Sequence, residues 1–318
     1  MRILFLFVAL LLQATAASGQ EWPAKAVRMI VPFPAGGSAD LLPRILGEKL
    51  AQQWGQPVIV ENRPGAAGNI GAAAVFQAEP DGYTLLASPP SPLVINRHLY
   101  PALAFDPTQF VPMAVIAAIP NVLLVNPKLA VNSLPELIAY AKEHPGKLNY
   151  ASQGNGTTSH LTTELLITMV GGLRMTHVPY KGSAPALADL LAGQADLMFD
   201  NLGVSLPHVK SGKLKALAVA GPRRFRALPD VPALAETLPG FESVAWFAIV
   251  GPPKTPGTVA AKVAGGVTES LRNPDVQRRL ADLSADPLGL GPAESAAFMR
   301  KDSDRWSAVI RAAGVKLE

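Results

Sequence analysis

Two glycine-containing stretches hold the side chains whose types and spacing are best suited to chemistry. The first reads PFPAGGSAD at residues 32–40, and the second reads YASQGNGTTSH at residues 150–160. In the first, Gly36 and Gly37 let backbone amides approach a ligand without obstruction by a Cβ atom, and Ser38 is expected to cap the helix that follows. The unpaired N–H groups and the dipole of such a helix start favour an anion, with no need for lysine or arginine.

Either stretch alone is equally well explained as a tight turn before a capped helix. The first has neither the Gly-Lys-Ser/Thr of a P-loop nor the spacing of a dinucleotide-binding motif, so a nucleotide phosphate is not indicated. Because the second stretch repeats the pattern much later in the chain, we expect it to lie in another domain, with both helix starts facing one cleft that holds a small carboxylate. Asp40 and Asp200 could accept hydrogen bonds from hydroxyl, amino or water groups there, or be helix-start carboxylates without a ligand.

Motifs of the common enzyme classes are absent from the sequence. It has no cysteine, no Gly-x-Ser-x-Gly elbow and no His-Glu-x-x-His motif. The five histidines lack the spacing of metal ligands: His98, His144, His160, His177 and His208. We therefore predict no catalytic residues, no cofactor and no metal, although the sequence leaves open a Ser/His/Asp site assembled from distant segments.

The glycine loops lie between apolar runs typical of strands and segments with helical spacing. Residues 26–31 lead into a helix over 41–53, and residues 148–151 lead into a helix over 158–170. Strands that alternate with helices predict an α/β fold with mostly parallel sheets.

The restart of this pattern predicts two domains on either side of a ligand cleft. Apolar runs near 122–125 and 244–250 are expected to carry the chain out of one domain and back again. We expect domain 1 to comprise residues 20–122 with 247–318, and domain 2 to comprise residues 123–246. The C-terminal third is expected to contain helices punctuated by turns.

The N-terminus has the features of a secretory signal peptide. Arg2 precedes an apolar run over residues 3–12 that is too short to span a bilayer, and small residues follow it. We predict a signal peptide over residues 1–19, cleaved after Ala16 or Gly19, and an exported mature protein; a retained N-terminal anchor is the alternative. Without cysteine, the chain can form neither a disulfide nor an acyl anchor.

The charge pattern argues against nucleic acid as a partner. The formal net charge is +4 over 318 residues. Basic residues occur in small groups, such as Arg223-Arg224, that do not alternate with aromatic side chains as a nucleic-acid surface would.

Six motifs, in order along the chain, resemble one protein family. They are PFPAGGSAD, ENRPGAAGNIGA, YASQGNGTTSHL, PYKGSAPALADLLAGQADLMFD, GKLKALAVAGPRRFRALPDVPALAE and GTVAAKV. Together they resemble the Bug family, the periplasmic solute-binding receptors of the tripartite tricarboxylate transporter system, from Trp22 to the C-terminus. The resemblance implies a class II periplasmic binding protein, a Venus flytrap of two α/β domains. Such a receptor works in the periplasm, closes over a small organic carboxylate and delivers it to a membrane permease. The sequence leaves the oligomeric state open, but a monomer suits a receptor that must close and dock.

The resemblance also implies which residues bind the ligand. One carboxylate would be held by backbone amides, hydroxyl groups and ordered water between residues 33–40 and residues 152–160, with Ser88 and Asp200 lining the rest of the pocket. The predicted ligand-binding residues are Phe33, Ala35, Gly36, Gly37, Ser38, Asp40, Ser88, Ser152, Gly154, Asn155, Thr157, Thr158, His160 and Asp200.

The segment Ser88-Pro89-Pro90-Ser91 departs from the family pattern, which has small or polar residues there. The two prolines remove two backbone donors, which indicates fewer polar contacts to the distal part of the ligand. Two other functions stay open: a ligand sensor that signals to a membrane partner, and a secreted α/β hydrolase.

Overall fold

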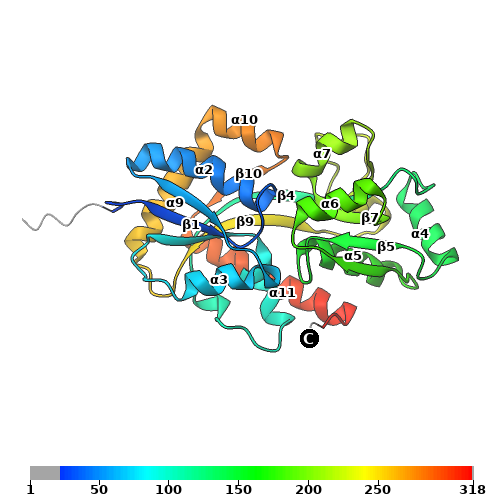
Figure 1. The fold of residues 1–318 in the computed structure, drawn as a ribbon, viewed down its shortest axis with the longest axis horizontal. Coiled ribbons are helices and arrows are strands. Elements are labelled where there is room, and N and C mark those ends of the chain that lie inside the picture. Colours follow the sequence, from blue (N-terminus) through cyan, green and yellow to red (C-terminus); the bar gives the residue numbers. More distant parts are fainter. Residues whose placement is uncertain (1–21, 317–318) are drawn as a thin grey trace, which may run out of the picture.

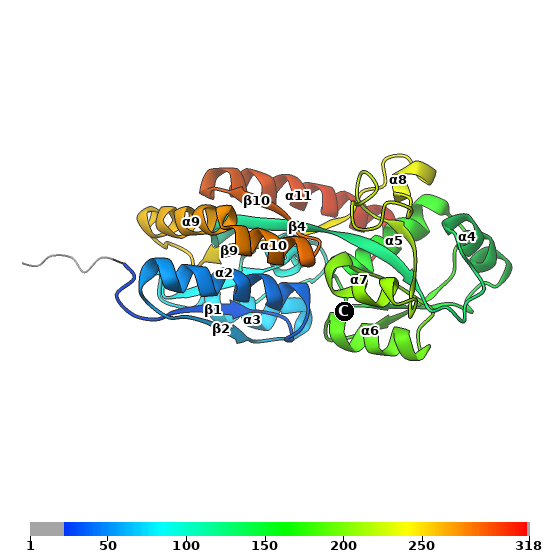
Figure 2. The same cartoon turned by 90° about the horizontal axis from the view of Figure 1, so that it is seen from above.

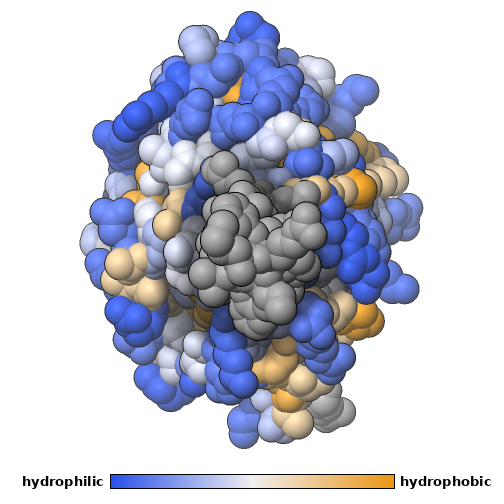
Figure 3. Space-filling view, turned by 90° about the vertical axis from the view of Figure 1, so that its left-hand side faces the viewer, coloured by the Kyte–Doolittle hydropathy of each residue, from blue (hydrophilic) through white to orange (hydrophobic). Residues whose placement is uncertain are grey.

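The computed structural model describes residues 22–316. The predicted signal peptide, residues 1–19, lies outside the described residues and stays a prediction. Within residues 22–316, no helix is both long and apolar enough to cross a membrane. The end of the molecule seen in Figure 3 is mostly hydrophilic, with hydrophobic residues scattered across it.

A ten-stranded sheet runs through the molecule, and its two halves share the long strand β4. The first half has the order β2-β1-β3-β9-β4, and the second continues from β4 through β7 and β5 to β6; β10 and β8 also pair with β4. Figure 2 shows β4 extending along the molecule from one half to the other. The strands are β1 (Val27–Val31), β2 (Val58–Asn62), β3 (Thr84–Ser88), β4 (Val111–Val125), β5 (Asn149–Ser152), β6 (Thr176–Pro179), β7 (Leu197–Asn201), β8 (Lys215–Val219), β9 (Val244–Gly251) and β10 (Asp286–Leu290).

Parallel pairing occurs in the strand–helix–strand units of both halves. Strand β1 is parallel to β2 and β3, and β5 is parallel to β6 and β7. Strand β9 is antiparallel to β3 and β4, and β4 is antiparallel to β7, β8 and β10. The sheets are therefore mixed, where the sequence predicted mostly parallel ones, because the strand that leaves one half and the strand that returns run in opposite directions.

Helices cover both faces of each half. In the first half, α2, α9 and α10 pack on one face and α3 and α11 on the other; in the second, α6 and α7 pack on one face and α4 and α5 on the other (Figure 1). Strand β1 is apolar apart from the exposed Arg28, because Met29 faces one covered side and Ile30 the other. The helices are α2 (Ser38–Trp54), α3 (Asn69–Phe76), α4 (Leu134–Glu143), α5 (Thr158–Val170), α6 (Ser183–Ala192), α7 (Leu202–Lys210), α8 (Leu234–Thr237), α9 (Gly257–Arg272), α10 (Pro274–Asp282) and α11 (Pro292–Ala313), with short turns at η2 (Ala66–Gly68), η3 (Ser91–Ile95), η4 (Asn96–His98) and η5 (Pro107–Gln109).

Strands β4 and β9 contain the two apolar runs that were expected to cross between domains. Residues 111–120 of β4 pair with β9, and residues 121–125 pair with β7 and β8. A buried polar cluster marks this change of partner, where Asn121 Nδ2 donates to Thr162 Oγ1 and to Ser243 Oγ, both at 3.3 Å. All three side chains are fully buried, so these hydrogen bonds satisfy groups that water cannot reach.

The C-terminal helix α11 is anchored to β9 by a buried carboxylate. Asp302 accepts hydrogen bonds from Trp246 Nε1 at 2.7 Å and Trp306 Nε1 at 3.1 Å, and it pairs with Arg305 Nη2 at 2.7 Å. The C-terminal third also contains strand β10, which the expectation of helices and turns missed. Its sequence DPLGL is poor in strand-forming residues, so its pairing with β4 depends on tertiary contact.

Candidate functional site

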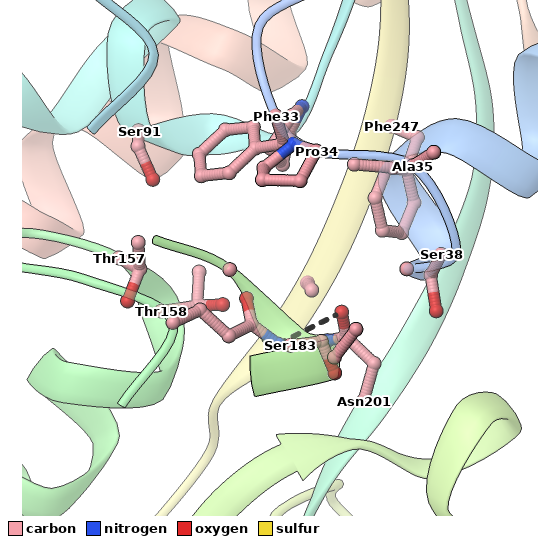
Figure 4. A pocket seen from close by; sticks show the side chains of 17 residues that line it. Phe33, Pro34, Ala35, Ser38, Ser91, Thr157, Thr158, Ser183, Asn201 and Phe247 are labelled. Carbon is pink, nitrogen blue, oxygen red and sulfur yellow. Dashed lines mark hydrogen bonds between the residues drawn. The ribbon is translucent and has the colours of Figure 1, made fainter. Parts of the chain in front are cut away.

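A cavity lies between the two halves of the molecule, where the loops after β1, β3, β5 and β6 meet. Phe33, Pro34 and Phe247 lie on one side of it, and Thr158 and Asn201 lie on the other (Figure 4). Its lining consists of Phe33, Pro34, Ala35, Gly37, Ser38, Ala39, Pro89, Ser91, Gln153, Thr157, Thr158, Gly182, Ser183, Ala184, Asn201, Ala245 and Phe247.

The first residues of three helices line this cavity, so the free N–H groups at these helix starts lie beside it. Helix α2 has Gly37 as its N-cap, α5 has Thr157, and α6 has Gly182. The sequence Gly-Ser-Ala occurs at the start of both α2 and α6, at residues 37–39 and 182–184. A Cβ atom built on Gly37 would lie 3.6 Å from Cβ of Ser183, so these two starts face each other across the cleft.

Residue 182 is glycine because of its backbone conformation and because the two halves approach each other closely there. Its φ of +133° is a conformation that side-chain-bearing residues rarely adopt, and a Cβ atom there would lie 3.1 Å from Cδ of Pro34. The loops after β1 and β6 therefore touch, and glycine permits the contact.

Ser38 has a role different from the expected one. Gly37 is the N-cap of α2, and Ser38 is the first helical residue with no capping hydrogen bond. Its side chain is buried, and its Oγ atom has no hydrogen-bond partner within residues 22–316. Because Ser38 lines the cavity (Figure 4), this hydroxyl is available to a ligand oxygen.

Asp40 stands behind the loop after β1 and does not line the cavity. Its carboxylate accepts hydrogen bonds from the Gly36 amide at 3.1 Å, from Arg44 Nε at 2.9 Å and from Asn62 Nδ2 at 2.8 Å. Burial acts to raise the pKa of Asp40, but these hydrogen bonds outweigh it and hold the pKa below its usual value. An ionised Asp40 thus holds the glycine loop in place.

Asp200 plays a similar part on the opposite wall. It is fully buried, and it accepts hydrogen bonds from Ser183 Oγ at 2.8 Å and from Gln153 Nε2 at 2.6 Å. Burial raises the pKa of Asp200 to about 6, against the opposing effect of these hydrogen bonds. Ser183 and Gln153 line the cavity whereas Asp200 does not, so Asp200 positions two lining residues.

Hydrogen bonds among its own residues and the start of α5 fix the loop between β5 and α5. Thr157 caps α5, accepting from the His160 amide at 3.4 Å and donating to the Gly154 carbonyl at 2.7 Å. The Gly156 amide donates to Nδ1 of His160 at 3.1 Å, which places the ring proton of the neutral imidazole on Nε2. His160 therefore fixes the loop, and its ring lies outside the cavity lining.

A stack of aromatic rings supports this loop. His160 lies on His177 with centroids 4.1 Å apart, and His177 lies on Tyr150 at 4.7 Å. His177 Nε2 is 2.7 Å from Oγ of Ser152, which in turn accepts from the Gly154 amide at 3.1 Å. Burial lowers the pKa of His160 to about 3, with a smaller contribution from His177, and lowers that of His177 to about 4, so both rings are neutral near pH 7.

The structure brings six of the predicted site residues to the cavity: Phe33, Ala35, Gly37, Ser38, Thr157 and Thr158. The others do not line it: Gly36, Asp40, Ser88, Ser152, Gly154, Asn155, His160 and Asp200. Ser88 is buried and donates to the Pro89 carbonyl at 2.9 Å, and Pro89 and Ser91 line the cavity in its place.

Sequence reasoning missed the start of α6 and the aromatic wall formed by Phe247. The start of α6 carried a usable signal, since Gly182-Ser183-Ala184 repeats the Gly-Ser-Ala of the first glycine loop. Phe247 carried none, because it lies within an apolar run that reads as a buried strand.

The chemistry of the lining favours a carboxylate over a metal or a cation. None of the described residues that line the cavity is charged, so helix dipoles, amides and hydroxyls supply its polarity. Within residues 22–316, no three His, Asp or Glu side chains gather in a group that could hold a metal ion. The cavity volume is about 20 Å³, little more than one water molecule needs, so the two halves are closed on each other.

Known proteins are similar to this chain in sequence and in fold. The family model described as the tripartite tricarboxylate transporter family receptor, TctC, matches residues 42–315. Protein BugT of Bordetella pertussis is 37% identical over 319 residues, which cover 99% of this chain and 98% of the relative. The structure of R. palustris Rpa4515 with adipate has a TM-score of 0.90 and 37% identity, covering 93% of this chain and 99% of that chain.

A second solved structure, MatC from Rhodopseudomonas palustris with bound malate, has a TM-score of 0.86 and 34% identity and covers 91% of this chain and 100% of that chain. The resemblance to the Bug receptors and the two-domain α/β fold that it implied are thereby confirmed. This chain belongs to the TctC family of tripartite tricarboxylate transporter receptors.

Proposed function

We propose that this protein is an extracytoplasmic receptor that binds a small organic carboxylate and delivers it to a tripartite tricarboxylate-type permease. One observation carries the proposal: three helix N-termini surround a cavity lined by no charged side chain among the described residues. Helix starts supply N–H donors and the positive end of the dipole. The buried Oγ of Ser38, which has no partner within residues 22–316, supplies a further donor.

Two relatives support a carboxylate as the ligand class. Rpa4515 was solved with adipate and MatC with malate, and both superpose on nearly the whole described chain. Ser38, Thr158 and Ser183 are the lining hydroxyls proposed to contact the ligand, while Asp40 and Asp200 keep the loops that carry them in position.

Closure of two domains is the proposed binding step. We assign residues 20–122 with 247–318 to one domain and residues 123–246 to the other, because β4 changes pairing partners next to residue 122 and β9 returns close to residue 247. A ligand that touches both walls lowers the free energy of the closed form by its differential affinity for that form. The two domains must move apart to admit or release the ligand, because the cavity between them is small.

We infer binding rather than catalysis from the lining itself. Among residues 22–316, no histidine, aspartate or glutamate lines the cavity, so none of them can act there as a general base to activate a serine. His160 and His177 are engaged by the main chain and by Ser152. A periplasmic location accords with the predicted signal peptide, and a monomer suits a receptor that closes and then docks to a permease.

Thermal unfolding of the mature protein with matched acids and amides tests the proposal. A ligand at about 100 times its Kd adds about 2.7 kcal/mol to the free energy of unfolding, a rise of several degrees in Tm. We expect adipate or malate to raise Tm and their diamides to leave it unchanged. Equal behaviour of acids and amides would contradict carboxylate recognition, and conversion of the acid to a product would identify an enzyme. If the protein is instead a ligand sensor, a ligand-dependent pull-down should retain a signalling protein rather than a permease.

A further inference from the structure

A groove at the mouth of the cleft shares walls with the cavity. Phe33, Pro34 and Gln153 line both. The groove volume is about 210 Å³, compared with about 20 Å³ in the cavity. Its other walls are Pro32, Pro64, Gly65, Ala66, Ala67, Gly68 and Tyr100 from the first half, and Gly154, Asn155, Pro179, Tyr180 and Lys181 from the second. Because both halves contribute walls, closure is what forms the groove.

Lys181 and Tyr100 are groove-lining residues whose side-chain donors have no hydrogen-bond partner within residues 22–316. Lys181 is exposed, is the one charged residue of this lining, and has no ion pair or hydrogen bond within residues 22–316. The hydroxyl group of Tyr100 also has no partner in the described part of the chain. Burial raises the pKa of Tyr100, which keeps its hydroxyl protonated and able to donate.

The rim of the groove is held in an unusual backbone conformation. Ala66 and Ala67 have φ values of +46° and +51°, in the left-handed region that alanine rarely adopts. Asn96 Nδ2 donates to the Ala67 carbonyl at 3.1 Å and so holds this turn against the groove. Strained turns of this kind persist where surrounding structure fixes them, often at ligand sites.

We propose that this groove is a second subsite, in which Lys181 and Tyr100 bind the distal carboxylate of an elongated ligand whose first carboxylate occupies the cavity. Apolar walls, including Pro64 and Pro179, suit the hydrocarbon chain between the two carboxylates. The ring of Phe33 borders both spaces and is the wall that the chain passes. The inference rests on the proposed function and narrows its ligand to dicarboxylates with an apolar linker.

Calorimetric titration with chain-matched acids tests the subsite. We compare adipate with hexanoate and suberate with octanoate, for the wild type, Lys181→Gln and Lys213→Gln. Lys213 is an exposed lysine on the turn after α7 that does not line the groove, and it serves as the control. We expect the wild type to bind the diacid more tightly than the monoacid, and Lys181→Gln to reduce that affinity ratio about fivefold, the upper range for an exposed ion pair.

Further results of these titrations test the second subsite separately from the proposed receptor function. Added salt should lower the ratio of diacid to monoacid affinity in the wild type and leave this ratio unchanged in Lys181→Gln. Adding Tyr100→Phe to Lys181→Gln should lower the ratio further. A wild type that binds both acids of a pair equally, or a Lys181→Gln ratio equal to that of Lys213→Gln, would overturn the subsite and leave the receptor function intact. Failure of the wild type to bind any carboxylate would overturn both.

Discussion

Leucine in place of Gly37 should make closure of the two halves on a ligand less favourable. A Cβ atom there would lie 3.6 Å from Cβ of Ser183, an ordinary van der Waals distance, so alanine fits the closed form. The rest of a leucine side chain has no room in a cavity of about 20 Å³. Overpacking of this kind costs about 1–3 kcal/mol, and because the closed form alone bears it, ligand affinity should fall about 5- to 150-fold.

The fold should survive this substitution. Gly37 has φ −90° and ψ 170°, an extended conformation open to any residue, and losing a favourable N-cap residue costs about 1 kcal/mol or less. Titration calorimetry on the wild type, Gly37→Ala and Gly37→Leu measures the effect. Gly257→Leu is the matched control, because Gly257 begins α9 and its Cβ position has no atom within 4 Å. A Gly37→Leu protein that binds as tightly as Gly37→Ala would refute the closure geometry.

Three further substitutions or conditions test other parts of the structure. Ser38→Ala should lower carboxylate affinity about two- to tenfold, which corresponds to the loss of one hydrogen bond. It should not lower the free energy of unfolding, since Oγ of Ser38 has no partner within residues 22–316. Calorimetry measures the affinity and urea unfolding the stability, and a loss of stability would contradict the assignment. The pKa of His160 lies near 3 in the fold and 6.5 in the unfolded chain, so below pH 6.5 the unfolded chain binds a proton that the folded chain does not. The free energy of unfolding should therefore fall with acid, by about 2 kcal/mol for this group at about pH 5, and His160→Gln should show a shallower pH dependence in urea unfolding; parallel profiles would contradict this. Asp302→Ala should destabilise the protein by about 3 kcal/mol, because it leaves Arg305 and the Trp246 N–H without their buried acceptor, and an unchanged Tm would disprove that anchor.

The glycine loops could be predicted from sequence because their signals are local. Gly36-Gly37 and the hydroxyl residues Thr157-Thr158 come within a few residues after apolar runs, and strand ends, glycine and helix caps are short-range patterns. Thr157 is the N-cap of α5, at the end of the second glycine loop. The two-domain α/β fold followed from the repetition of these units together with the family resemblance.

The direction in which a side chain points was beyond sequence reasoning. Asp40 and Asp200 are polar residues beside the cleft, yet neither lines the cavity, and both hydrogen-bond to the loops and side chains that form it. Ser91 and Phe247 reach the cavity through tertiary contact between segments far apart in the chain, which no local pattern records. The antiparallel pairing of β10 was missed for the same reason.

A crystal structure of the protein with the carboxylate that gives the largest rise in Tm tests carboxylate capture most directly. We expect one carboxylate oxygen within hydrogen-bond distance of Ser38 Oγ and of an N–H group at the start of α2 or α6, with the ligand touching both walls of the cleft. A ligand bound elsewhere, or in contact with one half alone, would contradict carboxylate capture by closure of the two halves.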